Sequence, residues 1–200
     1  RNYGHLEGIK TVQKIVEASI QFKVPVISFY VFSTENWKRP KNEINYLFNL
    51  ISIYFKKEIN KIVKNNIKII ISGRLKKLPL KIKKTLKNAA KETQKNNKLI
   101  VNLAINYGSK NEIIDAIKKI NLKSENVTEE KINKSLYVNI PFPDILIRTG
   151  GKKRLSNFML WQLAYTEIFF LDKLWPDFSK FDLKKIIKKY NKITRNFGGI

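Results

Sequence analysis

Hydrophobic and polar positions alternate along the chain in blocks that predict strands and helices in turn. Apolar and β-branched runs, typical of buried strands, occupy 25–32, 67–73, 99–105, 144–148 and 167–171. Apolar residues at helical spacing instead predict helices over 6–21, 42–65, 79–96, 110–120, 128–135 and 180–192. Continuous apolar strands separated by helices predict an α/β fold, with a mainly parallel β-sheet flanked by helices.

The longest expected helix begins with Asn42 as its cap and runs to about Asn65. Its apolar stripe comprises Ile44, Leu47, Phe48, Ile51, Tyr54, Phe55, Ile59 and Ile62. One face of this helix is therefore expected to lie against the sheet.

Polar clusters follow three of the expected strands, at 33–39, 106–110 and 148–156. The first of them, in "FSTENWKRP", contains Ser33, Thr34, Glu35, Asn36, Trp37, Lys38 and Arg39. In a parallel sheet, ligands bind beyond the carboxyl ends of the strands. We therefore expect these clusters to form one site.

Length and composition favour a single globular domain over residues 1–200. The chain has 200 residues with 43% hydrophobic content and no cysteine, which excludes disulfides and thiolate metal sites and favours a reducing, cytoplasmic compartment. No apolar run reaches transmembrane length and no signal peptide is visible. The chain begins with Arg1 rather than Met, and we expect the natural N-terminus to lie further upstream.

A net charge of +24 has two main interpretations. One is nucleic-acid binding. The other, which we favour, is a general enrichment in lysine, isoleucine and asparagine, because the lysines are scattered through stretches such as 76–98 and 180–192. A role for the charge at a membrane surface also stays open.

Arginine is rare among the 40 basic residues, with only six positions. Arg39, Arg148 and Arg154 each stand in a polar segment after an apolar run, where a planar guanidinium suits phosphate or carboxylate. In "RTGGKKRLSN" (148–157), two glycines let the backbone approach an oxyanion, and Ser156 near a helix start adds a donor. The segment suits a diphosphate, although an ordinary exposed turn has the same composition.

Two further residues have both structural and chemical interpretations. His5 is the only histidine. It is either a capping or core residue, or it donates a hydrogen bond to phosphate and carries a proton. Glu167 opens the last strand, as a solvated carboxylate or as a ligand for a hard cation such as magnesium.

Several long motifs together resemble one family. "RNYGH", "FSTENWKRP", "NYG", "IRTGG-KRLSNF-LWQLAYTE-FF", "LWPDF" and "FGG" occur in this order over essentially the whole chain. The pattern closely resembles the cis-prenyltransferases, specifically bacterial undecaprenyl diphosphate synthases (isoprenyl transferases). The resemblance implies an enzyme that adds isopentenyl diphosphate to an allylic diphosphate, usually farnesyl diphosphate, making cis double bonds. It also implies Mg²⁺, a homodimer, a hydrophobic tunnel for the growing chain, and a lipid product delivered to the membrane surface for cell-wall synthesis.

The resemblance also assigns roles to residues. Asn36 matches the position that removes the proton from the condensing unit, and His5 is expected to assist catalysis. A neutral amide is a weak base, so Asn36 is expected to work through a diphosphate oxygen or water. The surrounding substrate positions are Ser33, Thr34, Glu35, Trp37 and Arg39. The resemblance implies that Arg1 and His5 bind the allylic diphosphate and that Glu167 binds magnesium. It assigns the isopentenyl diphosphate site to Arg148, Arg154, Leu155 and Ser156.

The chain departs from the family pattern in three places. The family opens with a strand ending in Asp-Gly-Asn-Gly-Arg-Trp, whose aspartate binds the magnesium-diphosphate, and that stretch would precede Arg1. Without it, a chain of these 200 residues is expected to be inactive. Lys152 stands where glutamate is usual, which could tighten anion binding, and Arg74 stands where aspartate is usual.

Two alternative functions stay open at this level. One is a non-catalytic or inactive subunit of a cis-prenyltransferase, which loss of the aspartate favours and retention of Glu35 and Asn36 disfavours. The other is a basic nucleic-acid-binding α/β protein, which leaves "STENW" unexplained. Product length is expected to depend on packing around residues such as Val31.

Overall fold

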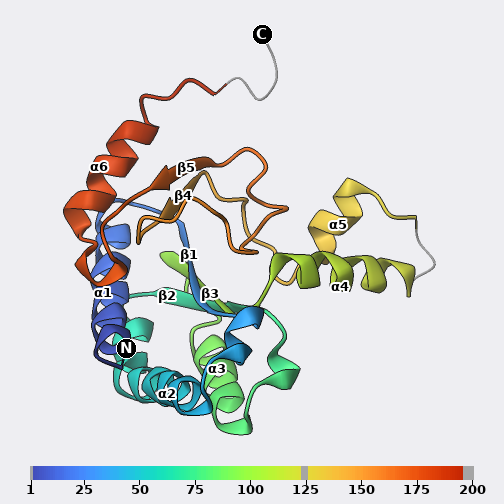
Figure 1. Cartoon of the computed structure of the whole chain (residues 1–200), viewed down its shortest axis with the longest axis horizontal. Coiled ribbons are helices and arrows are strands. Elements are labelled where there is room, and N and C mark those ends of the chain that lie inside the picture. The colour runs from blue at the N-terminus through green and yellow to red at the C-terminus, as the bar shows by residue number, and fades with distance from the viewer. Residues whose placement is uncertain (1, 123–125, 196–200) are drawn as a thin grey trace.

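The computed structural model describes residues 2–122 and 126–195, and five strands and six α-helices lie within these ranges (Figure 1). The strands are β1 (Val26–Ser33), β2 (Ile67–Ser72), β3 (Leu99–Tyr107), β4 (Ile145–Arg148) and β5 (Glu167–Phe170). The helices are α1 (Asn2–Gln21), α2 (Lys41–Lys64), α3 (Leu80–Glu92), α4 (Ser109–Asn121), α5 (Glu129–Ser135) and α6 (Lys180–Tyr190). Three short 3-10 helices are η1 (Thr34–Lys38), η2 (Leu75–Lys77) and η3 (Trp175–Asp177). Every strand and helix expected from the sequence is present, with ends shifted by a few residues.

All strand pairs are parallel, as the alternation of strands and helices predicts. The order in the larger sheet is β1-β3-β2, and β4 pairs with β5 in a second sheet. The expectation of one sheet therefore needs correction. Among the described residues, β1 pairs only with β3 and β4 only with β5, so nothing described hydrogen-bonds the two sheets together.

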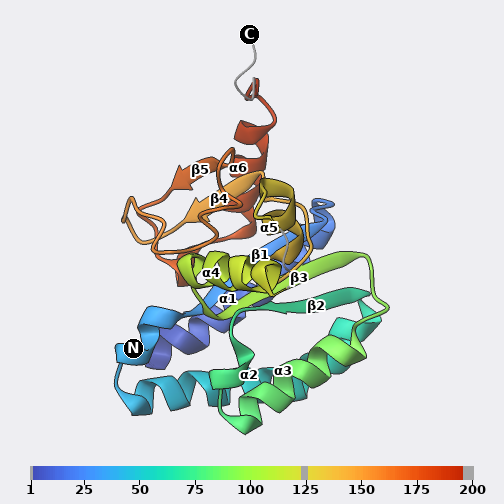
Figure 2. The same cartoon turned by 90° about the vertical axis from the view of Figure 1, so that its right-hand side faces the viewer.

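Helices α2 and α3 cover one face of the larger sheet, as the lower layer in Figure 2. Six residues of the stripe expected on α2 are buried there: Ile44, Leu47, Phe48, Ile51, Phe55 and Ile62. Ile82, Leu86 and Ala89 of α3 join the same core. Burial of a large aliphatic or aromatic side chain contributes about 1.5–3 kcal/mol, so this core is a main source of stability.

A second core joins the two sheets through side chains. Ile27 and Phe29 of β1 and Ile145 and Ile147 of β4 pack against the same buried residues from α1 and α6. On the opposite side, Tyr107 packs with Phe158, and α4 packs against α5. The two sheets thus belong to one body although their backbones are not paired.

The start of α2 differs from expectation. The helix begins at Lys41 with Pro40 at the capping position, not Asn42. The Asn42 carboxamide oxygen instead accepts a bond from the Glu43 amide at 2.8 Å. Among the described residues, no helix is long and apolar enough to cross a bilayer.

Candidate active site

The three polar clusters meet at the carboxyl edge of the sheets, as expected. β1 carries a register irregularity between Tyr30 and Ser33, immediately before η1. Such bulges re-aim side chains at the end of a strand and are common beside active sites. Hydrogen bonds then tie η1 to the end of β3 and to the loop that follows β4.

Within η1, Asn36 and Trp37 are fixed by different partners. The Ser33 amide donates to Asn36 Oδ1 at 3.1 Å, so the carboxamide oxygen already accepts one hydrogen bond. Trp37 Nε1 donates to Asn106 Oδ1 at 2.7 Å, and its ring packs edge-on against Phe32 with 5.1 Å between centroids. The position of η1 is therefore fixed both by hydrogen bonds and by packing of the Trp37 ring.

Asn106 is a buried residue at the start of the expected polar cluster 106–110, although no individual role was predicted for it. It is 2% exposed and has φ +50°, a backbone conformation that asparagine tolerates better than most residues. Its Nδ2 donates to the Arg74 carbonyl at 2.8 Å. Asn106 thus joins the ends of β1, β2 and β3 at one point.

Asn157 performs the same task for the loop that follows β4, and it was also missed. Its Nδ2 donates to Glu35 Oε1 at 2.9 Å, and its Oδ1 accepts from the Lys110 amide at 2.9 Å. Its backbone has φ +63°. A Cβ at Gly108 would lie 2.6 Å from Thr34 Oγ1 and 2.7 Å from Asn157 Nδ2, so a larger residue there would force one of these side chains to move.

The loop after β4 carries the cationic part of the site. Arg148 Nη1 donates to Ser156 Oγ at 2.9 Å and to the Arg154 carbonyl. Burial, together with the nearby Arg154 charge, lowers the Arg148 pKa. Arg154 is exposed, and Leu155 packs against the aromatic cluster around Tyr107. Two guanidinium groups and a hydroxyl close together favour an anion between them.

Two expectations about this loop need correction. The amides of Gly150 and Gly151 donate to the Lys173 and Leu171 carbonyls at 2.9 Å, so they are not free to bind an oxyanion. Positive φ at both glycines is what allows this extension of the β4–β5 pairing. Ser156 also does not lie near a helix start, because 156–165 form turns rather than an α-helix.

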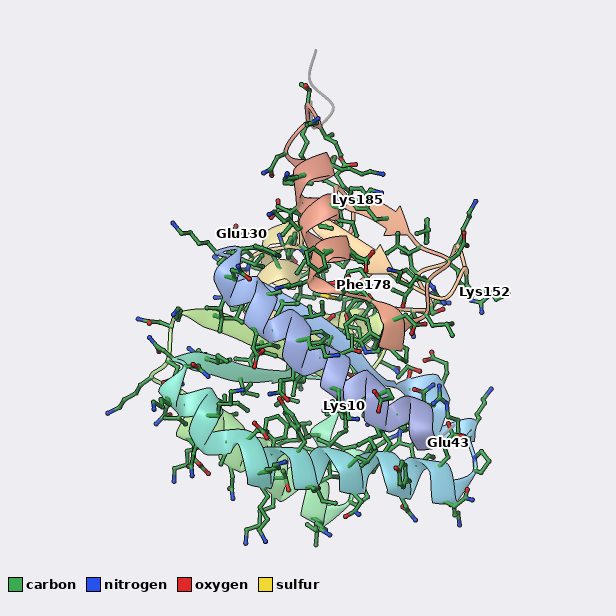
Figure 3. All side chains as sticks on the ribbon, turned by 90° about the vertical axis from the view of Figure 1, so that its left-hand side faces the viewer. Lys10, Glu43, Glu130, Lys152, Phe178 and Lys185 are labelled. Atoms are coloured by element: carbon green, nitrogen blue, oxygen red, sulfur yellow. The ribbon has the colours of Figure 1, made fainter. Side chains whose placement is uncertain are left out.

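His5 and Arg39 converge on one carboxylate. Arg39 Nη1 donates to Glu43 Oε1 at 3.1 Å, and His5 Nε2 lies 3.5 Å from the same oxygen. Figure 3 labels Glu43 at the start of α2, beside the first turns of α1. Glu43 was not among the expected site residues, and Arg1 lies outside the described residues.

Electrostatics keep Glu35 ionised. Burial raises its pKa, but hydrogen bonds from Asn157, the backbone, Ser33 and Thr34 outweigh this effect, and the pKa lies below its usual value. Burial, with the Glu35 charge nearby, raises the pKa of Tyr30 to about 12, and its hydroxyl donates to the Ser156 carbonyl at 3.2 Å. The site therefore contains an ionised carboxylate beside neutral donors.

Glu167 is not brought to this cluster. It pairs with Ile145 at the amino end of the small sheet, whereas Arg148 pairs with Phe170 at the carboxyl end. Three residues of strand separate them, which is about 10 Å. Within 2–122 and 126–195, no group of three or more His, Asp or Glu residues could hold a metal ion. The residues present thus do not form a complete magnesium site.

The two unusual basic residues have different surroundings. Arg74 makes a bidentate pair with Asp115 at 2.7 and 2.8 Å, and Tyr137 donates to the same carboxylate at 2.5 Å. Arg74 therefore has a structural partner beside the site. Lys152 is exposed on the loop between β4 and β5, as Figure 3 shows.

Comparison with known proteins identifies the family. A family model described as "Putative undecaprenyl diphosphate synthase" matches residues 1–198. An isoprenyl transferase from Fusobacterium nucleatum is 44% identical over 202 residues, covering 100% of this chain and 87% of that protein. One from Halalkalibacterium halodurans is 44% identical over 205 residues, with 98% and 80% covered.

Two solved structures are similar to the chain along most of its length. A crystal structure described as a probable undecaprenyl diphosphate synthase from Campylobacter jejuni has a TM-score of 0.89 at 38% identity and covers 96% of this chain and 92% of that one. Lavandulyl diphosphate synthase from Lavandula x intermedia, in complex with dimethylallyl diphosphate, has a TM-score of 0.94 at 30% identity, with 98% and 89% covered. With the site geometry, these matches establish that the chain belongs to the cis-prenyltransferase family of isoprenyl transferases and undecaprenyl diphosphate synthases, and that it is a prenyltransferase.

Proposed function

We propose that the natural gene product condenses isopentenyl diphosphate with an allylic diphosphate, farnesyl diphosphate first, to make undecaprenyl diphosphate for cell-wall lipid carriers. The observation that supports this best is the joining of Arg148, Arg154 and Ser156 to η1 through Asn157. Because this loop lies beside the polar end of β1, the joint supports an anion-binding role for it. Two diphosphate substrates need such adjacent sites.

The two substrates bind at opposite ends of the site. Arg148, Arg154 and Ser156 bind the diphosphate of isopentenyl diphosphate, and the half-buried Leu155 contacts its carbon chain. Arg1 and His5, with Arg39 nearby, bind the allylic diphosphate. Ionisation of that substrate leaves a carbocation and a departing diphosphate, and fixed cations stabilise the anion because they need no reorganisation. The alkene of isopentenyl diphosphate then attacks the allylic carbon.

A proton must leave after this attack, and Asn36 directs it without acting as the base. The Asn36 oxygen already accepts from the Ser33 amide, which leaves Nδ2 as its free donor. That donor binds a diphosphate oxygen, and the oxygen or a water takes the proton. His5 assists at the allylic side.

Magnesium fits only in part. The family implies Mg²⁺, and such an ion is commonly held by one or two carboxylates together with substrate phosphates. The ion would enter with the diphosphate and neutralise part of its charge. Glu167 would contribute a ligand only from outside the cluster around Arg148, and no step above depends on it.

The growing chain is placed between α1 and α2. A pocket of about 300 Å³ lies there, with apolar walls from Val16, Ile20, Tyr54, Ile62 and Ile67. Val31 packs against the neighbouring core. These residues form the distal part of a product tunnel, and product length follows from how far the chain can enter.

A further strand of the domain fits between β1 and β4. Both strands lack a described partner on the facing edge, yet their side chains share one core. In the longer gene product that we propose, this strand and its aspartate loop complete the sheet. If this strand exists, the backbone amides of β1 and β4 should exchange hydrogen more slowly in the longer product than in residues 1–200. Equal exchange rates in the two proteins would contradict it.

The enzyme works as a cytoplasmic homodimer. The edge strand β5 exposes 39% of Ile168 and 37% of Phe170, which is the kind of surface that a second copy covers. The lipid product is delivered to the membrane surface. Light scattering of the purified protein measures the dimer directly.

The function is tested by elongation of farnesyl diphosphate with labelled isopentenyl diphosphate and Mg²⁺, using the natural gene product. We expect long polyprenyl diphosphates, and an Arg148→Lys variant with KM for isopentenyl diphosphate raised about tenfold because the bidentate grip is lost. Absence of any product from a folded natural protein would identify a non-catalytic subunit instead.

A further inference from the structure

Basic residues are concentrated in one part of the chain. Residues 56–98 contain 15 of the 40 basic side chains and only two of the 16 acidic ones, Glu58 and Glu92. This segment of 43 residues therefore carries +13 of the net +24. A general enrichment in lysine would spread the charge more evenly along the chain.

The fold gathers these lysines onto one layer. α2 and α3 bury their apolar faces against the larger sheet, so their other faces point outward together. The exposed lysines within residues 56–98 are Lys56, Lys57, Lys61, Lys64, Lys76, Lys77, Lys81, Lys84, Lys87, Lys91, Lys95 and Lys98. Figure 3 shows many side chains that end in nitrogen along the outer side of this layer.

The apolar residues between the lysines indicate the kind of partner. Among residues 41–98, all of which are described, the large hydrophobic side chains that are exposed are Ile53 (55%), Val63 (39%) and Leu80 (82%). All three are aliphatic, whereas proteins that bind single-stranded nucleic acid stack bases on aromatic side chains. The one arginine in the segment, Arg74, is engaged by Asp115. Lysines interspersed with aliphatic side chains suit anionic lipid head groups above an acyl layer.

We propose that the outer face of α2 and α3 docks on an anionic lipid bilayer. This docking rests on the proposed function only for its biological purpose. An isoprenoid lipid made by the enzyme must pass to a membrane. The pocket between α1 and α2 supports this orientation, because Glu58 and Lys61 of the same layer line it. A chain leaving that pocket would emerge beside the docked face.

The test measures co-sedimentation of the full chain with phosphatidylglycerol-containing vesicles and with pure phosphatidylcholine vesicles, without substrates. One variant replaces Lys81, Lys84, Lys87 and Lys91 of α3 by glutamine. A matched control replaces Lys184, Lys185, Lys188 and Lys189 of α6, which are equally exposed and lie at the other end of the molecule (Figure 2). Both variants change the net charge by the same amount.

We expect the unsubstituted protein to bind only the anionic vesicles, and NaCl raised from about 50 to about 500 mM to release it. The α3 variant should lose about 30-fold or more in partitioning, and the α6 control less than about threefold. Equal losses in both variants would show that bulk charge alone is responsible and would overturn the proposal. Binding to RNA in preference to vesicles would overturn it as well. Because no substrate is present, failure here is distinguishable from failure of the elongation assay.

Discussion

Asn157 donates a hydrogen bond to Glu35 across 2.9 Å, between residues 122 positions apart in the chain. The bond joins the loop that carries Arg154 and Ser156 to the loop that carries Asn36. The same side chain accepts from the Lys110 amide at the start of α4. One asparagine therefore sets the distance between the two halves of the proposed substrate site.

Replacing Asn157 by alanine should reduce both stability and activity. The lost hydrogen bond to the ionised Glu35 should cost about 1.5–3 kcal/mol of stability. Because the same bond holds the two loops of the proposed site in register, kcat/KM of the folded variant should also fall, about tenfold or more. The left-handed backbone at this position should also cost about 1–2 kcal/mol with alanine. Steady-state kinetics and urea unfolding measure the two effects separately.

Asn66 provides a matched control for that substitution. It also has a positive φ, of +57°, and its side chain also makes two hydrogen bonds, to Asn97 at 2.9 Å each. It lies at the amino end of the sheet. Asn66→Ala should lower stability similarly and leave kcat/KM unchanged. Equal kinetic losses in both variants would mean that Asn157 acts only through stability.

Lys152→Glu should weaken binding of isopentenyl diphosphate. The substitution places a negative charge on the loop that carries Arg148 and Arg154, where the anion is proposed to bind. We expect KM for isopentenyl diphosphate to rise about threefold at low salt, with the difference shrinking as salt increases, because the charge is exposed. Lys185→Glu on α6 controls for net charge. An unchanged KM in Lys152→Glu would place the diphosphate elsewhere.

Asp182 should make stability depend on pH below pH 4. Its carboxylate accepts from the Ser179 hydroxyl and amide and from Lys173, and these bonds lower its pKa from 3.8 to about 2. A lowered folded-state pKa stabilises the fold above pH 3.8, and this stabilisation is lost as pH falls toward about 2. Asp182→Asn should therefore reduce the free energy of unfolding at pH 6 more than at pH 3. The same reduction at both pH values would contradict the assignment.

The strands and helices were predictable because apolar periodicity is a local property. Continuous apolar runs marked all five strands, and the α2 stripe gave six buried residues correctly. The apolar runs do not show which strands become neighbours, so they did not predict the division into two sheets. The resemblance does bear on it, because the family's opening strand would precede Arg1 and we propose that it lies between β1 and β4. The start of α2 was assigned to Asn42 from its residue type, whereas Pro40 occupies the capping position in the fold.

The site residues were predictable where the residue type itself indicates the chemistry. They were not predictable where the role depends on backbone conformation or on partners distant in sequence. Arg148, Arg154 and Ser156 stood out as anion-binding types and do lie together. Asn106 and Asn157 act through left-handed backbone and through partners distant in sequence, which no local pattern reveals. Gly150 and Gly151 suggested free amides, but those amides extend the β4–β5 pairing.

Substitutions of Asn36 can decide whether its side chain removes the proton or only binds diphosphate. The Ser33 amide holds the Asn36 oxygen at 3.1 Å, and an aspartate oxygen could accept the same bond. Asn36→Asp therefore keeps the loop in place while replacing the Nδ2 donor by a negatively charged oxygen.

If Asn36 binds diphosphate through Nδ2, both Asn36→Asp and Asn36→Ala should lower kcat about 100-fold. Alanine removes the Nδ2 donor, and aspartate replaces it by an oxygen that repels the anion. If Asn36 were the base, aspartate would be the stronger base, and Asn36→Asp would retain activity that Asn36→Ala loses. Asn42→Asp controls for the added charge, since its side-chain oxygen also accepts from a backbone amide, at 2.8 Å, near the start of α2. Single-turnover kinetics should therefore group Asn36→Asp with Asn36→Ala and leave Asn42→Asp close to the unsubstituted enzyme.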